Sequence, residues 1–131
     1  MGTNERFVVV VEDDTAMRKS IVRFLQARGY ASTGFSSAEE FLASSILDRV
    51  IGLVLDIHLK GMSGIELRHH LSVMKLTIPV VFITARDDEA TRLGALAAGC
   101  VDFLHKPFVP EQLKAKLLEI LSRSPDGVEE I

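Results

Sequence analysis

The chain has a single cysteine, Cys100, among its 131 residues, so no disulfide can form within it. This scarcity is typical of proteins from a reducing compartment, and we expect Cys100 to be a small packing residue and the protein to be cytoplasmic. No apolar run approaches the roughly 20 residues needed to cross a bilayer. The first six residues are polar and lack the apolar segment of a secretory signal, so we expect no membrane association.

The chain also lacks an excess of basic residues. Its 15 Lys and Arg against 18 Asp and Glu give a formal net charge of -3, which offers no general basis for binding nucleic acid. The spacing of histidines that is typical of zinc sites, such as i and i+4 on one helix, is also missing. His69 and His70 are adjacent on an expected helix and face different ways, while His58 and His105 lie far apart in the sequence. We expect surface histidines rather than a zinc centre.

The sequence does contain five alternations of strand-like and helix-like segments, which predict one α/β domain with a parallel sheet. Strands are expected at about 7–12, 30–35, 51–55, 79–83 and 101–104. Helices are expected at about 17–28, 37–46, 63–74, 87–99 and 110–121, followed by a polar tail. Capping boxes begin the second and third helices, and Gly29 is placed as the stop of the first.

Four of the expected strands end in residues suited to phosphate chemistry. The carboxyl ends of parallel strands line one crevice of an open sheet, so side chains that follow different strands meet there. The sequence therefore predicts one pocket with three carboxylates, a hydroxyl and an amine, contributed by Asp13, Asp14, Asp56, Thr84 and Lys106.

The acidic residues of this pocket point to a divalent cation. Two like charges ~4 Å apart cost on the order of 4 kcal/mol at an effective dielectric near 20, a large share of the ~5–15 kcal/mol stability of a domain. A bound cation, or protonation of some of the acids, makes such a group tolerable. Oxygen-only ligands favour Mg²⁺ or Mn²⁺. Asp14 alone fits a second interpretation equally well, because it stands just before Thr15 as a helix N-cap.

The pocket also has the parts needed for phosphoryl transfer. An aspartate is a known nucleophile toward phosphoryl groups, and Lys106 and Thr84 supply a point charge and a hydroxyl for phosphate oxygens. Transfer of a phosphoryl group asks a protein mainly for positioning and charge neutralisation. These carboxylate, hydroxyl and amine groups together predict a pocket in which an acyl-phosphate forms on an aspartate and is then stabilised.

Five motifs in order resemble the receiver domain of two-component response regulators, across about residues 6–122. They are Glu12-Asp13-Asp14, Leu55-Asp56, Gly61-Met62-Ser63-Gly64, Thr84-Ala85 and Phe103-Leu104-His105-Lys106-Pro107-Phe108. The resemblance implies a flavodoxin-like, doubly wound (βα)5 fold with strand order 2-1-3-4-5. Residues 123–131 would then be a polar tail or the stump of a linker.

The same resemblance implies the site roles. Asp56 is expected to accept the phosphoryl group from a histidine kinase, a phosphotransfer protein or a small phosphodonor, without the chain being an enzyme in its own right. Magnesium is expected on Asp13, Asp14, Asp56 and the backbone carbonyl of His58, with Lys106 on the phosphoryl oxygens. Thr84 and Phe103 are expected to be the switch residues, although an aromatic on a parallel strand is also an ordinary core residue.

Receivers of this kind often form dimers through the fourth helix, fifth strand and fifth helix, and many precede a DNA-binding output domain. We expect such a domain, where one exists, outside this chain, because nothing here resembles a recognition helix.

Two departures from the family pattern concern the loops. Lys60 stands where the family often has proline, and His58 and Arg86 occupy positions that bear on the lifetime of the acyl-phosphate. The rival hypothesis is a phosphatase of the haloacid dehalogenase type. That class needs an aspartate two residues after the nucleophile, where this chain has His58.

Overall fold

The computed structural model describes residues 5–85, 90, 93–94 and 103–122. Five parallel strands form one sheet in the order β2-β1-β3-β4-β5, which confirms the predicted doubly wound fold and its order. The strands are β1 (Phe7–Val11), β2 (Ser32–Phe35), β3 (Val50–Asp56), β4 (Val80–Thr84) and β5 (Phe103–His105).

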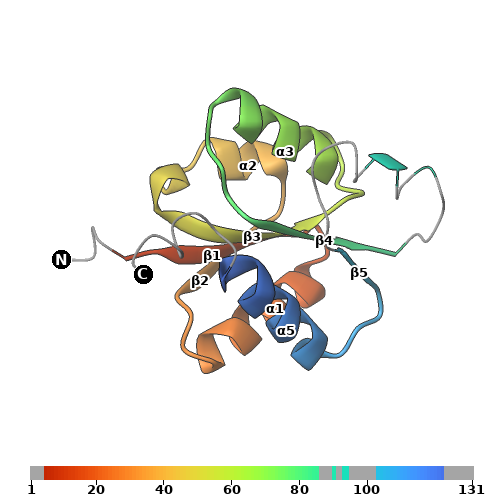
Figure 1. Ribbon diagram of the computed structural model, residues 1–131. Coiled ribbons are helices and arrows are strands. Elements are labelled where there is room, and N and C mark those ends of the chain that lie inside the picture. The colour runs from red at the N-terminus through yellow and green to blue at the C-terminus, as the bar shows by residue number, and fades with distance from the viewer. Residues whose placement is uncertain (1–4, 86–89, 91–92, 95–102, 123–131) are drawn as a thin grey trace.

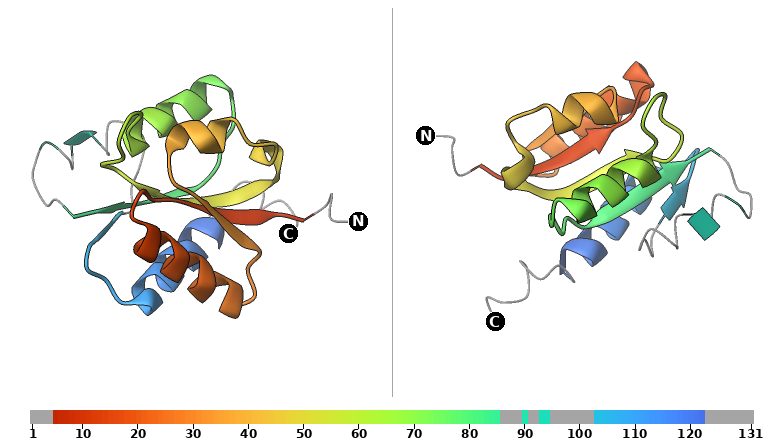
Figure 2. Two further views of the ribbon diagram at one scale, coloured as in Figure 1. Left: turned by 180° about the vertical axis from the view of Figure 1, so that it is seen from behind. Right: turned by 90° about the horizontal axis from the view of Figure 1, so that it is seen from above.

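Helices cover both faces of this sheet. Figures 1 and 2 show α2 and α3 on one face and α1 and α5 on the other. The helices are α1 (Thr15–Ala27), α2 (Ala38–Leu42), α3 (Gly64–Val73) and α5 (Pro110–Ser122), with a short 3-10 turn at Leu47–Arg49. None of the helices in the described residues is long and apolar enough to span a membrane.

Strand β1, an interior strand of the sheet, is buried because helices cover both of its faces. Residues 8–11 of β1 are all 0% exposed. Val9 and Val11 belong to the apolar cluster under α2 and α3, whereas Val8 and Val10 belong to the cluster under α1 and α5. This alternation follows from the two-residue period of a strand. The unbroken apolar run of β1 therefore predicts a strand in the middle of the sheet, as observed.

Local signals fix where the first two helices begin and end. The Asp14 side chain caps α1, and Gly29, with φ of +94°, follows its end as predicted. Ser37 caps α2. This helix stops at Leu42, short of the expected end at Ile46. The hydroxyl of Ser44 donates to the carbonyl of Phe41 at 2.7 Å, an alternative to continued helical bonding.

Other boundaries differ from expectation by one or two residues. The second strand begins at Ser32 rather than Tyr30, and β3 runs one residue further at each end. Most of the helix expected at 87–99, the first two residues of the strand expected at 101–104 and the tail at 123–131 lie outside the described residues, as do Arg86 and Cys100.

Candidate functional site

The strand register brings several polar residues to one edge of the sheet. Val11 of β1 pairs with Leu55 of β3, so Glu12 and Asp56 come next at neighbouring strand ends. Asp56 in turn pairs with Ile83, and Thr84 of β4 pairs with His105 of β5. Because all the strands run the same way, these residues share the carboxyl edge of the sheet, where open α/β sheets bind ligands.

Three carboxylates meet at this edge and are called the acid cluster below: Glu12, Asp13 and Asp56. Each offers an oxygen, and these oxygens lie within 4.8 Å of one another. Glu12 is 0% exposed and Asp56 5%, so water does little to screen their repulsion. Oxygen donors this close together form a group that could bind a hard divalent cation.

Lys106 places a positive charge beside the acid cluster. Its Nζ lies 2.7 Å from Oε1 of Glu12 and 3.0 Å from Oδ2 of Asp56. The Lys106 backbone N–H donates to the Thr84 carbonyl at 2.7 Å, which ties β5 to β4 at this point. The peptide bond from Lys106 to Pro107 is cis. Lys106 thus stabilises two carboxylates at once.

The second oxygen of Asp56 is held by the loop that follows it. The His58 backbone N–H donates to Oδ1 of Asp56 at 2.9 Å. The Gly64 backbone N–H donates to the Ile57 carbonyl at 3.0 Å, which closes the loop. A Cβ on Gly64 would collide with the backbone carbonyl of Asp56, so glycine permits this close approach. Both Asp56 oxygens are therefore oriented before any ligand arrives.

Burial and charge shift two pKa values in this group. Burial raises the pKa of the Glu12 carboxyl from 4.5 to about 7, and the repulsion from Asp56 adds to that rise. The hydrogen bonds from Lys106 and the Asp14 backbone oppose the rise without cancelling it. For Lys106, burial alone lowers the pKa, but the bonds to Glu12 and Asp56 outweigh burial and raise it. Lys106 stays charged, while Glu12 titrates near neutrality.

Among the predicted site residues, Asp13, Asp56 and Lys106 lie together, but Asp14 lies apart from them. Its Oδ1 accepts the backbone N–H of Met17 at 2.8 Å, so its side chain is the exposed N-cap of α1. Glu12 takes the place in the acid cluster that the sequence analysis gave to Asp14. Two signals could have found this. Glu12 directly follows a strand buried on both faces, and Asp14 occupies a preferred N-cap position.

Thr84 and Phe103 lie on the other half of the sheet, at the end of β4 and the start of β5. Thr84 is 0% exposed at the end of β4. Phe103 is partly buried on β5, packs against the apolar cluster under α2 and α3, and stacks on the His105 ring at 6.2 Å between centroids. Its partial burial fits either of the two interpretations of this aromatic.

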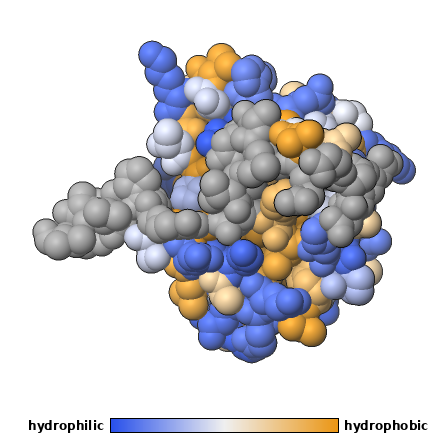
Figure 3. All heavy atoms as spheres, turned by 45° about the vertical axis from the view of Figure 1, so that its right-hand side comes forward, coloured by the Kyte–Doolittle hydropathy of each residue, from blue (hydrophilic) through white to orange (hydrophobic). Residues whose placement is uncertain are grey.

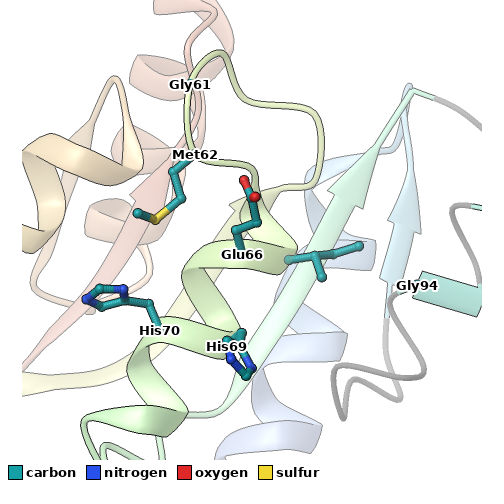
Figure 4. Close-up of a pocket in the computed structure, with 7 residues that line it drawn as sticks. Gly61, Met62, Glu66, His69, His70 and Gly94 are labelled. Carbon is teal, nitrogen blue, oxygen red and sulfur yellow. The ribbon is translucent and has the colours of Figure 1, made fainter.

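A cavity of about 690 Å³ lies beside α3, on the face shown in Figure 4. Its described lining is Gly61, Met62, Ile65, Glu66, His69, His70 and Gly94. None of these residues belongs to the acid cluster. Figure 4 shows that the Glu66, His69 and His70 side chains point in different directions, and Glu66 is occupied in the capping box of α3. This cavity is separate from the carboxyl-edge site.

Comparison with known proteins agrees with the fold. The family model described as "Response regulator receiver domain" matches residues 8–118. This chain belongs to that family. The receiver is 38% identical over 112 residues to nodulation protein W of Bradyrhizobium diazoefficiens, covering 86% of this chain and 49% of that protein. It is 35% identical over 124 residues to the response regulator MprA of Mycobacterium leprae, covering 94% of this chain and 54% of that protein.

A solved structure gives the same result in three dimensions. The receiver superimposes on the crystal structure of FixJ-N with a TM-score of 0.77 and 34% identity, covering 91% of this chain and 94% of that one. The chain spans about half the length of the curated relatives it matches. Response regulators act in phosphorelay signalling, and this chain is a receiver domain of that family.

Proposed function

We propose that Asp56 is the residue that accepts the phosphoryl group, in a magnesium-dependent transfer from a histidine kinase or a phosphotransfer protein. The observation that carries the proposal is the orientation of both Asp56 oxygens, by the His58 N–H at 2.9 Å and by the Lys106 ammonium at 3.0 Å. A preorganised nucleophile beside a cation is what phosphoryl transfer requires.

In this transfer an Asp56 oxygen forms a bond to phosphorus while the bond from phosphorus to the donor breaks. Lys106 can exchange its contact with Asp56 for one with a phosphoryl oxygen, since its charge is retained and it already lies 3.0 Å away. The donors fit Mg²⁺ or Mn²⁺, with Glu12, Asp13, Asp56 and the His58 carbonyl as ligands. The bound cation would neutralise the charge that gathers on the transferred group.

We also propose that Thr84 and Phe103 report the phosphorylated state. Thr84 would approach the new phosphate and Phe103 would turn inward, reshaping the surface of β5 and α5. Figure 3 shows apolar side chains interspersed among hydrophilic ones on the face in view. Val109, just before α5, and Leu118 in α5 are large exposed apolar side chains. This supports a homodimer that uses this surface.

The wider proposal concerns the chain as a whole. The receiver would extend over 6–122, with 123–131 as a tail or linker, and would act in the cytoplasm as a phospho-acceptor rather than as an enzyme that turns over a substrate. The length of the relatives supports an output domain outside this chain, DNA-binding or otherwise. The net charge of -3 supports the absence of direct nucleic-acid binding.

Incubation with Mg²⁺ and acetyl phosphate tests the proposal. Intact-mass spectrometry should show one added phosphoryl group on the wild-type protein and none on Asp56→Asn, while the exposed Asp48→Asn is labelled like the wild type. Equal labelling of Asp56→Asn would reject Asp56 as the acceptor. Steady turnover of a phosphate monoester would instead favour the phosphatase hypothesis.

A further inference from the structure

Between its two end residues, the loop from β3 to α3 (residues 57–63, the β3–α3 loop) is held by side chains through three backbone N–H groups, those of His58, Lys60 and Met62. Those of His58 and Lys60 donate to the acid cluster, at 2.9 and 3.3 Å. The third, that of Met62, donates to Oε2 of Glu39 at 2.8 Å. Glu39 lies on α2, 23 residues away in the sequence and outside the acid cluster. It is thus a separate anchor for a loop that begins beside Asp56.

Helix capping does not explain this use of Glu39. The cap of α2 employs the next acid, Glu40, whose Oε1 accepts the backbone N–H of Ser36 at 3.1 Å and its hydroxyl at 2.8 Å. The Glu40 backbone N–H in turn donates to Ser37. Glu39 therefore remains available to the loop. The two acids share a helix and a charge but contact different segments, which makes Glu40 a matched control.

Gly61 has the backbone conformation and the small size that the Glu39 contact requires. Its φ of +75° lies in the left-handed region, which favours glycine. A Cβ at this position would come within 2.8 Å of Oε2 of Glu39. Figure 4 shows Gly61 and Met62 in the turn that precedes α3. A side chain here would strain the loop and push the Glu39 carboxylate away from Met62.

The three hydrogen bonds that hold the loop should respond differently to a bound cation. The Lys60 N–H donates to Oδ2 of Asp13 over a long 3.3 Å, and the same carboxylate is a proposed metal ligand. Coordination of a cation would compete with that hydrogen bond. The Glu39 bond to Met62 is shorter and involves no residue of the acid cluster, so coordination of a cation there would not compete for it.

We propose that Glu39 is a positioning residue for the phosphorylation site: it holds the β3–α3 loop, and with it the His58 backbone, in place for the divalent cation. The inference rests on the proposed function, because it assumes that the acid cluster and the His58 carbonyl bind Mg²⁺. It assigns a role in the site to α2, a helix that contributes no side chain to the acid cluster.

The test measures Mg²⁺ affinity by isothermal titration calorimetry on the wild type and on Glu39→Ala, Glu39→Gln and Glu40→Ala. Glu39→Ala should weaken Mg²⁺ binding about fivefold, equivalent to about 1 kcal/mol for one hydrogen bond. Glu39→Gln keeps an acceptor oxygen and should stay within about twofold of the wild type. Glu40→Ala should lower the melting temperature through the lost cap and leave Mg²⁺ affinity unchanged.

Hydrogen exchange at the Met62 amide gives an independent readout. Its protection should fall in Glu39→Ala and remain in Glu39→Gln and Glu40→Ala. Unchanged protection in Glu39→Ala, or equal Mg²⁺ affinity in Glu39→Ala and the wild type, overturns the inference. Equal weakening in Glu39→Gln and Glu39→Ala overturns it as well, because charge rather than the hydrogen bond would then be responsible. A wild-type protein that binds no Mg²⁺ would instead reject the proposed function.

Discussion

The two halves of the sheet hold their carboxyl ends in different ways. At the β1–β3 half, Glu12 and Asp56 are 0% and 5% exposed and Lys106 bridges them. At the other half, β5 is an edge strand of three residues, and its Phe103 is only partly buried. A site that gathers like charges needs fixed geometry, whereas a segment that rearranges needs weaker packing. In the proposed function, the receiver separates these two requirements between the two halves of one sheet.

The largest effect on the β1–β3 half should come from Lys106→Met. The substitution leaves Glu12 and Asp56 without their shared cation and removes a charged contact for the transferred group. We expect phosphorylation by acetyl phosphate to slow about 100-fold, in the range seen when one oxyanion-stabilising donor is lost.

Stopped-flow or quenched labelling with acetyl phosphate measures this rate. Lys19→Met removes an exposed lysine of α1 and should label at the wild-type rate. If Lys106→Met were labelled as fast as Lys19→Met, the β1–β3 half of the site would not depend on the Lys106 ammonium. The contrast between the two halves of the sheet would then be wrong.

A smaller effect should follow from the raised pKa of Glu12, which burial places at about 7 against 4.5 for the free side chain. Between these values the folded state binds more protons than the unfolded state, so the free energy of unfolding of the metal-free protein should fall as pH rises. Glu12→Gln does not titrate and should flatten that slope.

Urea unfolding across this pH interval in the presence of a chelator checks the prediction. Mg²⁺ should reverse the trend for the wild type, because the cation favours the ionised carboxylate and is bound with release of a proton. Parallel pH profiles for the wild type and Glu12→Gln would count against a protonated, buried Glu12.

The smallest effect on phosphorylation should come from Phe103→Ala, on the other half of the sheet. Phe103 packs on apolar residues and on the His105 ring and is not a member of the acid cluster. The initial rate of labelling should therefore stay within about twofold of the wild type, as expected for a residue outside the reacting group. The response to phosphorylation should change instead. Amide chemical shifts in α5, recorded with and without beryllium fluoride, should move less than in the wild type, and equal movement would identify Phe103 as an ordinary core residue.

The sequence could predict the features that depend on local pattern. The unbroken run of β1 indicates a strand covered on both faces, and the residues after the strands indicate a shared edge. The strand order itself came from the resemblance to receivers, since periodicity does not specify which strands are neighbours. Asp14 shows the limit of spacing arguments. Only Asp13 stands between Glu12, which is buried in the acid cluster, and Asp14, which caps α1. The two roles can be told apart only by knowing that β1 ends at Val11.

The contact between Glu39 and Met62 was beyond prediction for a different reason. This contact joins α2 to the β3–α3 loop, and no periodic pattern in the sequence relates these two segments. It depends on how α2 packs over the sheet. The early end of α2 belongs to the same class, because the hydrogen bond from Ser44 to Phe41 competes with a helical pattern that continues to Ile46.

Locating a bound cation tests the central claim most directly. Crystals grown with Mn²⁺ and measured for its anomalous scattering should show the ion in contact with Glu12, Asp13 and Asp56, with Asp14 still capping α1. An ion coordinated by the Asp14 side chain, or one bound away from Asp56, would contradict the account.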